Sequence, residues 1–419
     1  MILRQPWLSR CLDGSNTVSG SKAVENRESG HATPGSQSKL RVLRISHSAT
    51  VDAYRERDRQ LSIREGIELE LITPKYWDHL GGKNEDIKER FPVYRAATFG
   101  TGSVPLFAFD PLIVKKALHD FKPDIVDVHE EPYSVSGYEC VLLSRLYAPD
   151  SVCVFYSAQN ILKRYPPPFC WTEQYVFKNS FGAYPCSEGV QTVLKTKGFA
   201  QNSAVIPLGV DLDLYTSVGS NKRADYQIEN GQFVIGYFGR IESYKGIQYL
   251  VEALARTKEA NWRLLVVGSG PYESDLRTLA SNLAVNERII WTGPVAGTEV
   301  PAYMRSCDLI AVPSLTTRTW KEQFGRIIVE SMACGVPCVA FDSGSLPEVV
   351  ADAGLVVAEG DVAELTEAIN RVATDPELKK TLRERGLERA RSEYSWGKVA
   401  QLMHDMYDRA IMLRNQSRS

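Results

Sequence analysis

The sequence lacks the long apolar run, the paired cysteines and the excess of one charge that mark several classes of protein. No apolar run reaches the roughly 18 residues of a transmembrane helix, and residues 1–10 contain no apolar core of a signal peptide. The chain has 49 Lys and Arg against 51 Asp and Glu, so its charge does not indicate nucleic acid as a partner. We therefore expect a cytoplasmic protein.

Metal and redox motifs are missing as well. The eight cysteines contain no CxxC pair, and no set of Cys and His has the spacing of a zinc site. Cys334 and Cys338 flank Gly-Val-Pro, and packing in a core is the simplest interpretation of both thiols. Asp211 and Asp213 have the letters of an Asp-x-Asp metal clamp, but they fall in an expected hinge. No metal and no bound cofactor are expected.

Strand and helix patterns alternate along most of the chain. Residues 1–39 are rich in Ser, Gly and Asn and read as a disordered leader. The alternation that follows predicts doubly wound parallel sheets, the α/β class. Strands are expected at 41–46, 68–72, 125–129, 152–157, 204–207, 233–238, 263–267, 288–292, 309–312, 337–341 and 354–357. The predicted domains are 40–208 and 209–394, joined by a hinge at 207–215 and followed by a C-terminal helix within 395–419.

The most informative segment contains two carboxylates, Glu322 and Glu330, on either side of a Phe-Gly step that opens an apolar helix. Helix N-termini bind anions through unpaired N–H groups, so a diphosphate would sit over Phe324, Gly325 and Arg326. Glu330 lies roughly 8–9 Å along the axis from the start of the helix, at 1.5 Å per residue. Because carboxylates accept hydrogen bonds from hydroxyl pairs, the arrangement predicts a nucleotide sugar.

An ordinary amphipathic helix, with a capping Glu322 and a solvated Glu330, is the alternative. The neighbours of Glu330 argue against it, since residues 327–329 and 332–333 are apolar and indicate a buried helix. An unpaired buried carboxylate would be costly. Glu330 is therefore expected to have a partner.

Two cations follow the buried strand expected at 233–238. Gly239, Arg240 and Lys245 come at its carboxyl end, which is where α/β sheets bind ligands. Arg offers a fork to phosphate oxygens and Lys a point charge. Either cation alone would read as a surface residue. Together with the two carboxylates they indicate a donor site for a nucleotide sugar.

The order and spacing of these motifs resemble those of the GT-B glycosyltransferases of family 4, which are retaining nucleotide-sugar enzymes. The resemblance extends over residues 40–415 and includes the motifs at 206–211, 266–271 and 344–348. It implies a GT-B fold of two Rossmann-like domains, with a closing helix that crosses back to the first domain. The donor-binding residues that it implies are Gly239, Arg240, Lys245, Gly268, Glu322, Phe324, Gly325, Arg326 and Glu330.

The resemblance also assigns roles within this set. Arg240 and Lys245 bind the diphosphate, Glu322 contacts the transferred sugar, and Glu330 contacts the ribose. Gly268 belongs to a Gly-x-Gly turn that reads as a tight turn near the nucleotide. It does not indicate an NAD site, because the third glycine of that fingerprint is replaced by Glu273.

His129 ends an expected strand whose carboxyl end faces the cleft. A lone histidine there is more often structural, but the family carries one beside the donor sugar. His129 is therefore expected to orient the sugar by hydrogen bonding rather than to act as a free base. Glu130 and Glu131 are either acceptor contacts or solvated. His47 stands where many members have a Gly-Gly loop, and it becomes a further candidate acceptor contact.

The implied activity is retaining transfer of a hexose from a UDP- or GDP-sugar to a hydroxyl of a glycan, a lipid-linked acceptor or a small molecule. We favour a front-face route that needs no metal. A double displacement would require Glu130 or Glu131 as nucleophile. The alternatives are a nucleotide-sugar epimerase or hydrolase of the same fold, or a non-catalytic scaffold. The complete donor set argues against both.

Two segments remain open to more than one interpretation. The run from Lys163 to Trp171 combines cations, aromatics and prolines, and is either a peripheral membrane contact or a rigid packed loop. We favour the packed loop. The stretch 315–321 is longer than the usual link into the Glu322 helix. It is either a lid over the donor pocket or a surface loop.

Overall fold

The computed structural model describes residues 39–77, 82–83, 88–100, 102–258 and 261–418. Lys39–Ser419 form one compact unit. The leader expected at 1–39 lies outside the described residues, apart from Lys39. Among the described residues, no helix combines the length and the apolar character needed to cross a membrane.

Within these residues the first sheet has seven parallel strands in the order β11-β10-β9-β8-β1-β2-β5. The strands are β1 (Leu40–Ile45), β2 (Ile67–Pro74), β5 (Val93–Ala96), β8 (Ile125–Val128), β9 (Val152–Ser157), β10 (Gly182–Pro185) and β11 (Asn202–Ser203). The connecting helices are η1 (Ser48–Thr50), η2 (Asp52–Arg55), α1 (Glu56–Ser62), α2 (Pro111–Phe121), α3 (Val135–Tyr147), α4 (Phe169–Asn179) and α5 (Glu188–Thr196). Two short antiparallel pairs are β3 (Tyr76–Trp77) with β4 (Gly82–Lys83), and β6 (Thr98–Phe99) with β7 (Ala108–Phe109).

The second sheet, again within the described part, has six parallel strands in the order β14-β13-β12-β15-β16-β17. They are β12 (Phe233–Phe238), β13 (Trp262–Val267), β14 (Ile289–Gly293), β15 (Leu309–Val312), β16 (Cys338–Phe341) and β17 (Gly354–Val357). Its helices are η3 (Ser243–Lys245), α6 (Ile247–Arg256), α7 (Glu273–Asn282), η4 (Asn286–Arg288), α8 (Val300–Met304), α9 (Arg326–Ala333), α10 (Leu346–Val350), α11 (Val362–Thr374) and α12 (Pro376–Ser392).

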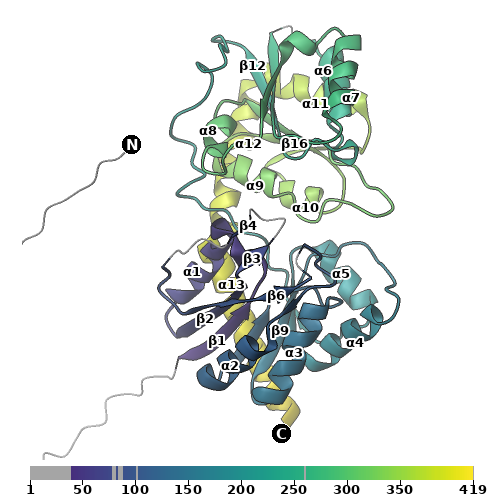
Figure 1. Ribbon diagram of the computed structural model, residues 1–419. Helices are drawn as coiled ribbons and strands as arrows, with labels where there is room; N and C mark the ends of the chain where they lie inside the picture. The colour runs from purple at the N-terminus through teal and green to yellow at the C-terminus, as the bar shows by residue number, and fades with distance from the viewer. Residues whose placement is uncertain (1–38, 78–81, 84–87, 101, 259–260, 419) are drawn as a thin grey trace, which may run out of the picture. The chain divides into compact units, whose positions relative to one another are not determined.

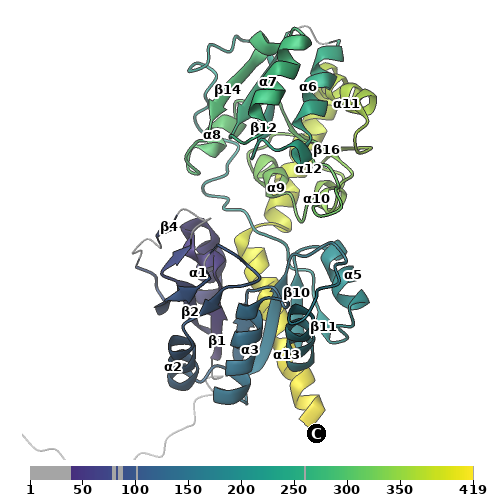
Figure 2. The ribbon, with the colours of Figure 1, turned by 45° about the vertical axis from the view of Figure 1, so that its right-hand side comes forward.

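Both sheets are doubly wound, and the predicted fold class is confirmed. Figures 1 and 2 show helices on both faces of each sheet, which explains why a strand such as β12 is buried along its whole length. In each sheet the strand order reverses beside the first strand, at β1 with β8 and at β12 with β15. Such reversal points are where ligands bind in this architecture.

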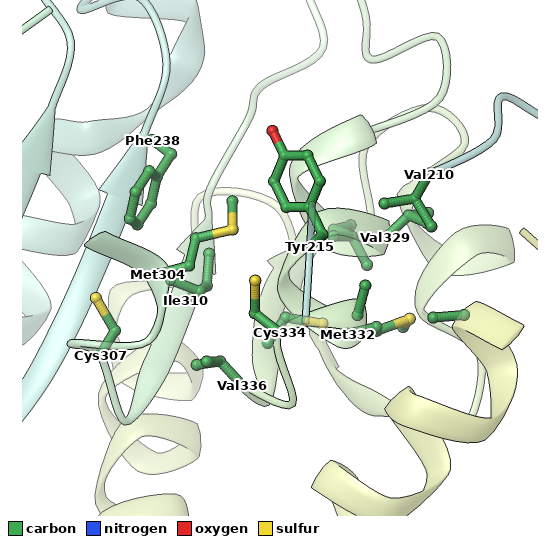
Figure 3. Close-up of a cluster of buried hydrophobic side chains, with 14 of the residues drawn as sticks. Val210, Tyr215, Phe238, Met304, Cys307, Ile310, Val329, Met332, Cys334 and Val336 are labelled. Carbon is green, nitrogen blue, oxygen red and sulfur yellow. The ribbon is translucent and has the colours of Figure 1, made fainter. Parts of the chain in front are cut away.

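A buried apolar cluster fixes α9 against the second sheet. Figure 3 shows part of it, with Phe238 and Ile310 of the sheet close to Met304, and Met332 on α9. On its other side α9 packs against α12, where a Cβ added to Gly386 would lie 3.2 Å from the Met332 side chain. The glycine allows this close approach. The start of α9 is thereby held at the carboxyl edge of the sheet.

The last helix, α13 (Trp396–Arg418), lies against α1, β9 and β10 of the first half (Figures 1 and 2, yellow). Its buried residues recur every three or four positions, as on one face of a helix: Trp396, Val399, Ala400, Met403, Met406, Tyr407 and Ala410. Tyr407 donates its hydroxyl hydrogen to the Asp127 carboxylate on β8. The end of the chain therefore supports the strand that precedes His129.

The strand prediction succeeds in the second half and fails in part of the first. All strands expected from 233 onward are present, with ends within one residue of those predicted. The strand expected at 204–207 is wrong, because the strand is β11 (Asn202–Ser203). Ala204 and Ile206 each donate one backbone bond to β10, but Pro185 has no N–H with which to return one. The strands β5 and β10 were not predicted.

Loss of the Tyr407 hydroxyl tests the attachment of α13. Tyr407→Phe is expected to lower the free energy of unfolding by about 1–2 kcal/mol, because a buried carboxylate loses one donor while keeping Arg44 and Tyr184. Urea unfolding measures this change. Met412→Ala, at a residue of the same helix that is 52% exposed, is the control and should change stability by less than about 0.5 kcal/mol. Equal effects of the two substitutions would contradict the assignment.

Candidate active site

A cavity of about 260 Å³ lies at the reversal point of the second sheet. Lys245 follows β12, Ser314 follows β15, and Glu322 precedes α9; all three line the cavity. Tyr156 and Ala158, from the end of β9, line it from the first half. The cavity is thus built from the carboxyl ends of strands in both halves.

Lys245 and Glu322 form an ion pair in the lining of this cavity. The Lys245 Nζ lies 2.8 Å from Glu322 Oε2, which also accepts a hydrogen bond of 3.0 Å from the Ser314 hydroxyl. The Trp320 ring packs against the Lys245 ammonium, with the nitrogen 4.5 Å from the ring centroid. A Cβ at Gly246 would lie 1.7 Å from the Pro313 carbonyl oxygen, so only glycine allows this close turn.

The start of α9 forms another wall of the cavity. Gly325 adopts a φ of 87° and caps the helix, whose first residue is Arg326. The first N–H groups of a helix lack acceptors within it. Nearby, a Cβ on Gly344 would lie 2.1 Å from the Glu322 carbonyl oxygen, and that oxygen accepts a bond from Ser345 N. The 344–348 motif therefore holds the backbone of Glu322 in place.

Glu330 is buried behind Arg326 and does not line the cavity. It is 5% exposed, and its Oε1 lies 2.8 Å from Arg326 Nη2. Burial raises the Glu330 pKa, while Arg326 and a hydrogen bond from Tyr215 oppose the rise. The prediction that a buried Glu330 needs a partner is confirmed.

The glycine turns near Arg240 directly follow β12 and β13. Gly239 and Gly268 adopt φ values of 145° and 134°, and a Cβ on Gly268 would lie 2.0 Å from the Gly239 carbonyl oxygen. The Arg240 side chain is 75% exposed and pairs with Glu242 at 2.7 Å. Of the expected donor residues, the cavity is lined by Lys245, Glu322, Phe324, Gly325 and Arg326. Those outside its lining are Gly239, Arg240, Gly268 and Glu330.

A second cavity, of about 340 Å³, adjoins the first. The two share Tyr156, Ala158, Leu208, Gln323 and Arg326. The second cavity is lined by all four candidate residues of the first half: His47, His129, Glu130 and Glu131. Below, we call it the acceptor-side cavity.

His129 is a neutral hydrogen-bond donor in this cavity. Its Nδ1 lies 3.0 Å from Arg57 Nη1, and because a guanidinium can only donate, Nδ1 accepts and the proton sits on Nε2. Burial, followed by the charges of Arg57 and Arg44, lowers the His129 pKa well below its ordinary value. The ring stacks on Tyr156 at 4.0 Å between centroids.

A buried polar network holds β8, the strand that precedes His129. The Asp127 carboxylate accepts hydrogen bonds from Arg44 at 2.7 Å and from the hydroxyls of Tyr184 and Tyr407. Arg44 also donates to Asp58. The sequence patterns did not predict this network. The available signal was a charged residue within each of two apolar strands, Arg44 on β1 and Asp127 on β8, since buried charges require partners.

His47 and Glu130 form a second ion pair. Glu130 accepts from His47 Nδ1 at 2.6 Å and from the His47 backbone N–H at 2.7 Å. Burial lowers the His47 pKa, but the charge of Glu130 and its hydrogen bond outweigh burial and leave the pKa raised. Glu130 is 1% exposed, so the alternative that it is solvated is wrong.

Glu131 is tied to the end of β9. Its carboxylate accepts hydrogen bonds of 2.8 Å from the Ser157 hydroxyl and from Ala158 N. Burial raises the Glu131 pKa to about 7. Glu131 thus fixes the start of the segment 158–163, whose later residues contact the second half.

Several hydrogen bonds join the two halves around the cavities. Asn160 Nδ2 donates to the Glu322 carbonyl oxygen at 2.7 Å, and Lys163 Nζ donates to the Thr319 carbonyl oxygen at 3.3 Å. Through Trp320, the stretch 315–321 covers Lys245, which favours the lid interpretation of this segment.

The aromatic-proline run is neither wholly packed nor wholly exposed. Tyr165 stacks on Tyr133 at 4.3 Å between centroids and lies beneath the Lys197 ammonium, whereas Trp171 is 67% exposed. Cys334 and Cys338 are free and buried, as expected. In the described part of the chain, no group of three or more His, Cys, Asp or Glu side chains is placed to hold a metal ion.

The fold is that of the GT-B glycosyltransferases. A sucrose-phosphate synthase from Thermosynechococcus elongatus matches with a TM-score of 0.69 and 20% identity, over 90% of this chain and 100% of that one. HepE from Anabaena, in complex with UDP-glucose, matches with a TM-score of 0.65 and 20% identity, over 87% and 98% of the two chains. At this identity the likeness concerns the fold alone.

The second half also matches a family model. Residues 219–389 match the model of glycosyl transferases group 1. The chain is 32% identical over 215 residues to a 2-deoxystreptamine glucosyltransferase from Streptomyces kanamyceticus, covering 49% of this chain and 54% of the relative. The chain thus spans about half the length of the curated relatives it matches.

The raised pKa of Glu131 predicts a pH-dependent stability. Its pKa is about 7 in the folded protein against an ordinary 4.5, so the folded state holds the proton more tightly. The stabilisation from this proton is complete below the unfolded pKa and is lost as the pH rises through about 7. Relative to wild type, Glu131→Gln should therefore gain up to about 3 kcal/mol between pH 5 and pH 8. Urea unfolding at both pH values measures this difference, and parallel profiles would refute the assignment.

Proposed function

We propose that the protein transfers a hexosyl group from a UDP- or GDP-sugar to a hydroxyl acceptor, with retention of anomeric configuration and without a metal ion. The observation that carries the proposal is the Lys245–Glu322 pair, placed beside the N-terminus of α9 in one cavity. The family model that residues 219–389 match supports a sugar-transfer reaction, as does the named activity of the glucosyltransferase relative.

In the proposed donor complex, the diphosphate lies against Lys245 and the first N–H groups of α9. Lys245 then pairs with phosphate, and the Glu322 carboxylate becomes available to accept hydrogen bonds from sugar hydroxyls. Arg240 reaches the diphosphate from its exposed position. Glu330 binds the ribose once Arg326 releases it, so donor binding exchanges two internal ion pairs for contacts with the ligand.

The acceptor lies in the adjoining cavity. His129 donates its Nε2 hydrogen to a hydroxyl of the transferred sugar and thereby orients it. The bond from the anomeric carbon to the phosphate oxygen breaks, the bond to the acceptor oxygen forms on the same face, and the departing phosphate takes the acceptor proton. Lys245, Arg240 and the start of α9 stabilise the charge that develops on the diphosphate.

The double displacement is disfavoured by the contacts of its two candidate nucleophiles. Both oxygens of Glu130 accept bonds from His47, and those of Glu131 accept bonds from Ser157 and Ala158. A carboxylate engaged on both oxygens is a poor nucleophile. We propose the front-face route for this reason.

Donor binding and turnover test the proposed donor site. Among UDP-, GDP-, ADP- and TDP-glucose, the matching donor at a hundred times its Kd should stabilise the protein by about 2.7 kcal/mol. Lys245→Ala and Arg240→Ala should each lower kcat/KM by at least about a hundredfold, because each removes a charge that acts on the leaving group. Arg256→Ala, at a largely exposed cation on α6, is the control. Normal turnover in either site variant would show that the donor site is misplaced.

Chelation and product stereochemistry test the rest of the mechanism. Because protein groups neutralise the diphosphate, full activity is expected in excess EDTA. An α-linked donor should give an α-linked product by NMR. Activity that is lost on chelation and restored by Mg²⁺ or Mn²⁺ would reveal a metal site. An inverted product would instead require a general base.

A further inference from the structure

Arg57 is a buried cation that lines the acceptor-side cavity. It lies on α1, is 3% exposed, and donates one hydrogen bond, to His129 Nδ1. Its Cζ lies 5.5 Å from the centroid of the Trp396 ring. A guanidinium has five N–H donors. Its other nitrogen atoms are not among the fully buried atoms that lack a partner, so they keep some accessible surface, and Arg57 lines this cavity.

The other charged groups around this cavity have partners. Three ion pairs account for most of them: Arg44 with Asp58 and Asp127, His47 with Glu130, and Arg326 with Glu330. Glu131 is bound to the end of β9. In the part of the chain that the structure describes, no carboxylate forms a salt bridge with Arg57.

Asp58 compensates Arg57 only in part. Burial raises the Asp58 pKa, and the charges of Arg44 and Arg57 oppose this rise, but the hydrogen bond of Asp58 goes to Arg44. A buried cation without a bonded counter-ion is costly, and an anion that binds it relieves much of that cost. The guanidinium of Arg57 therefore offers an anion in this cavity several N–H donors and a positive charge that is partly shielded from water.

We propose that the acceptor is a small hydroxylated compound that carries a phosphate monoester, and that Arg57 binds this phosphate. The inference rests on the proposed function and extends it to the class of acceptor. A cavity of about 340 Å³ lies within the usual range for small ligands, about 300–1,000 Å³. Bound in this way, the acceptor lies beside His129, because the same guanidinium holds Nδ1 of that histidine.

The diphosphate of the donor is the other possible source of this anion. Arg57 lines the acceptor-side cavity and not the cavity that contains Lys245 and the start of α9. The position of Arg57 favours the acceptor. A test must nevertheless fill the donor site first, so that the two phosphates are distinguished.

The test measures binding of inorganic phosphate, and of glucose 6-phosphate against glucose, to the full chain saturated with UDP at constant ionic strength, with GDP in place of UDP if GDP is the nucleotide that binds. Isothermal titration calorimetry gives each Kd. Arg57→Gln is the test variant, because its amide N–H can still donate to His129 while the charge is removed. Arg59→Gln is the matched control on α1, since Arg59 pairs with Glu89 and Asp52 and does not line the cavity.

Wild type and Arg59→Gln should bind phosphate and glucose 6-phosphate in the presence of UDP, and glucose at least tenfold more weakly than glucose 6-phosphate. Arg57→Gln should weaken both phosphate ligands at least tenfold and leave UDP binding unchanged. Absence of phosphate binding to the UDP-saturated wild type, or equal binding by Arg57→Gln, would overturn the proposal. Competition between phosphate and UDP would assign the anion to the donor and overturn it as well.

Failure of the proposed function has a different signature. In that case neither UDP nor GDP binds, or Lys245→Ala leaves binding of the nucleoside diphosphate unchanged, whatever the result with phosphate. A second readout is the His129 imidazole, followed by NMR. Burial and then the charge of Arg57 lower the His129 pKa. A phosphate at Arg57 offsets that charge, so phosphate should raise the His129 pKa in wild type and not in Arg57→Gln.

Discussion

The carboxylate of Asp127 is the interaction on which the first half of the site depends. It accepts from Arg44 on β1, Tyr184 on β10 and Tyr407 on α13, so three separate elements meet at one buried anion on β8. Such a group is stabilising only if its donors are complete. The network fixes the end of β8, and His129 follows two residues later. The position of the imidazole is therefore set by contacts far from it in sequence.

In the second half of the site, close contacts between backbone segments hold the functional residues in place. In the first half, buried charged groups do so. Gly246 lets the turn after β12 touch the Pro313 carbonyl, and Gly344 lets its loop touch the Glu322 carbonyl. These contacts bring Lys245 to Glu322, and each group then satisfies the other in the absence of ligand. An ion pair of this kind keeps both groups in position for the proposed donor, and neither is left as an isolated charge.

The sequence predicted features that depend on residues close together in the chain, and it did not predict contacts between residues that are far apart in it. Lys245, Glu322 and the Phe-Gly step lie in loops beside apolar strands or helices, where order and spacing are informative. The strands from 233 onward were equally clear, because buried parallel strands are continuous apolar runs. Tyr407 binds Asp127 across 280 positions, and no periodicity on α13 separates it from an ordinary core tyrosine. Arg57 follows Arg55 and precedes Asp58 in a charged stretch that reads as a solvated helix, although all three are buried.

Arg57 links the electrostatics of the two proposed substrates. Its positive charge helps to keep His129 neutral, and its hydrogen bond places the remaining imidazole proton on Nε2. A protonated His129 beside the sugar would lose its lone pair on Nδ1 and repel the guanidinium, so the two groups are stable together only in the observed state. An anion bound to Arg57 reduces the electrostatic effect of the guanidinium on the His129 imidazole, but the hydrogen bond from Arg57 to Nδ1 remains. The tautomer that is proposed to orient the sugar is therefore retained when the proposed acceptor fills the cavity.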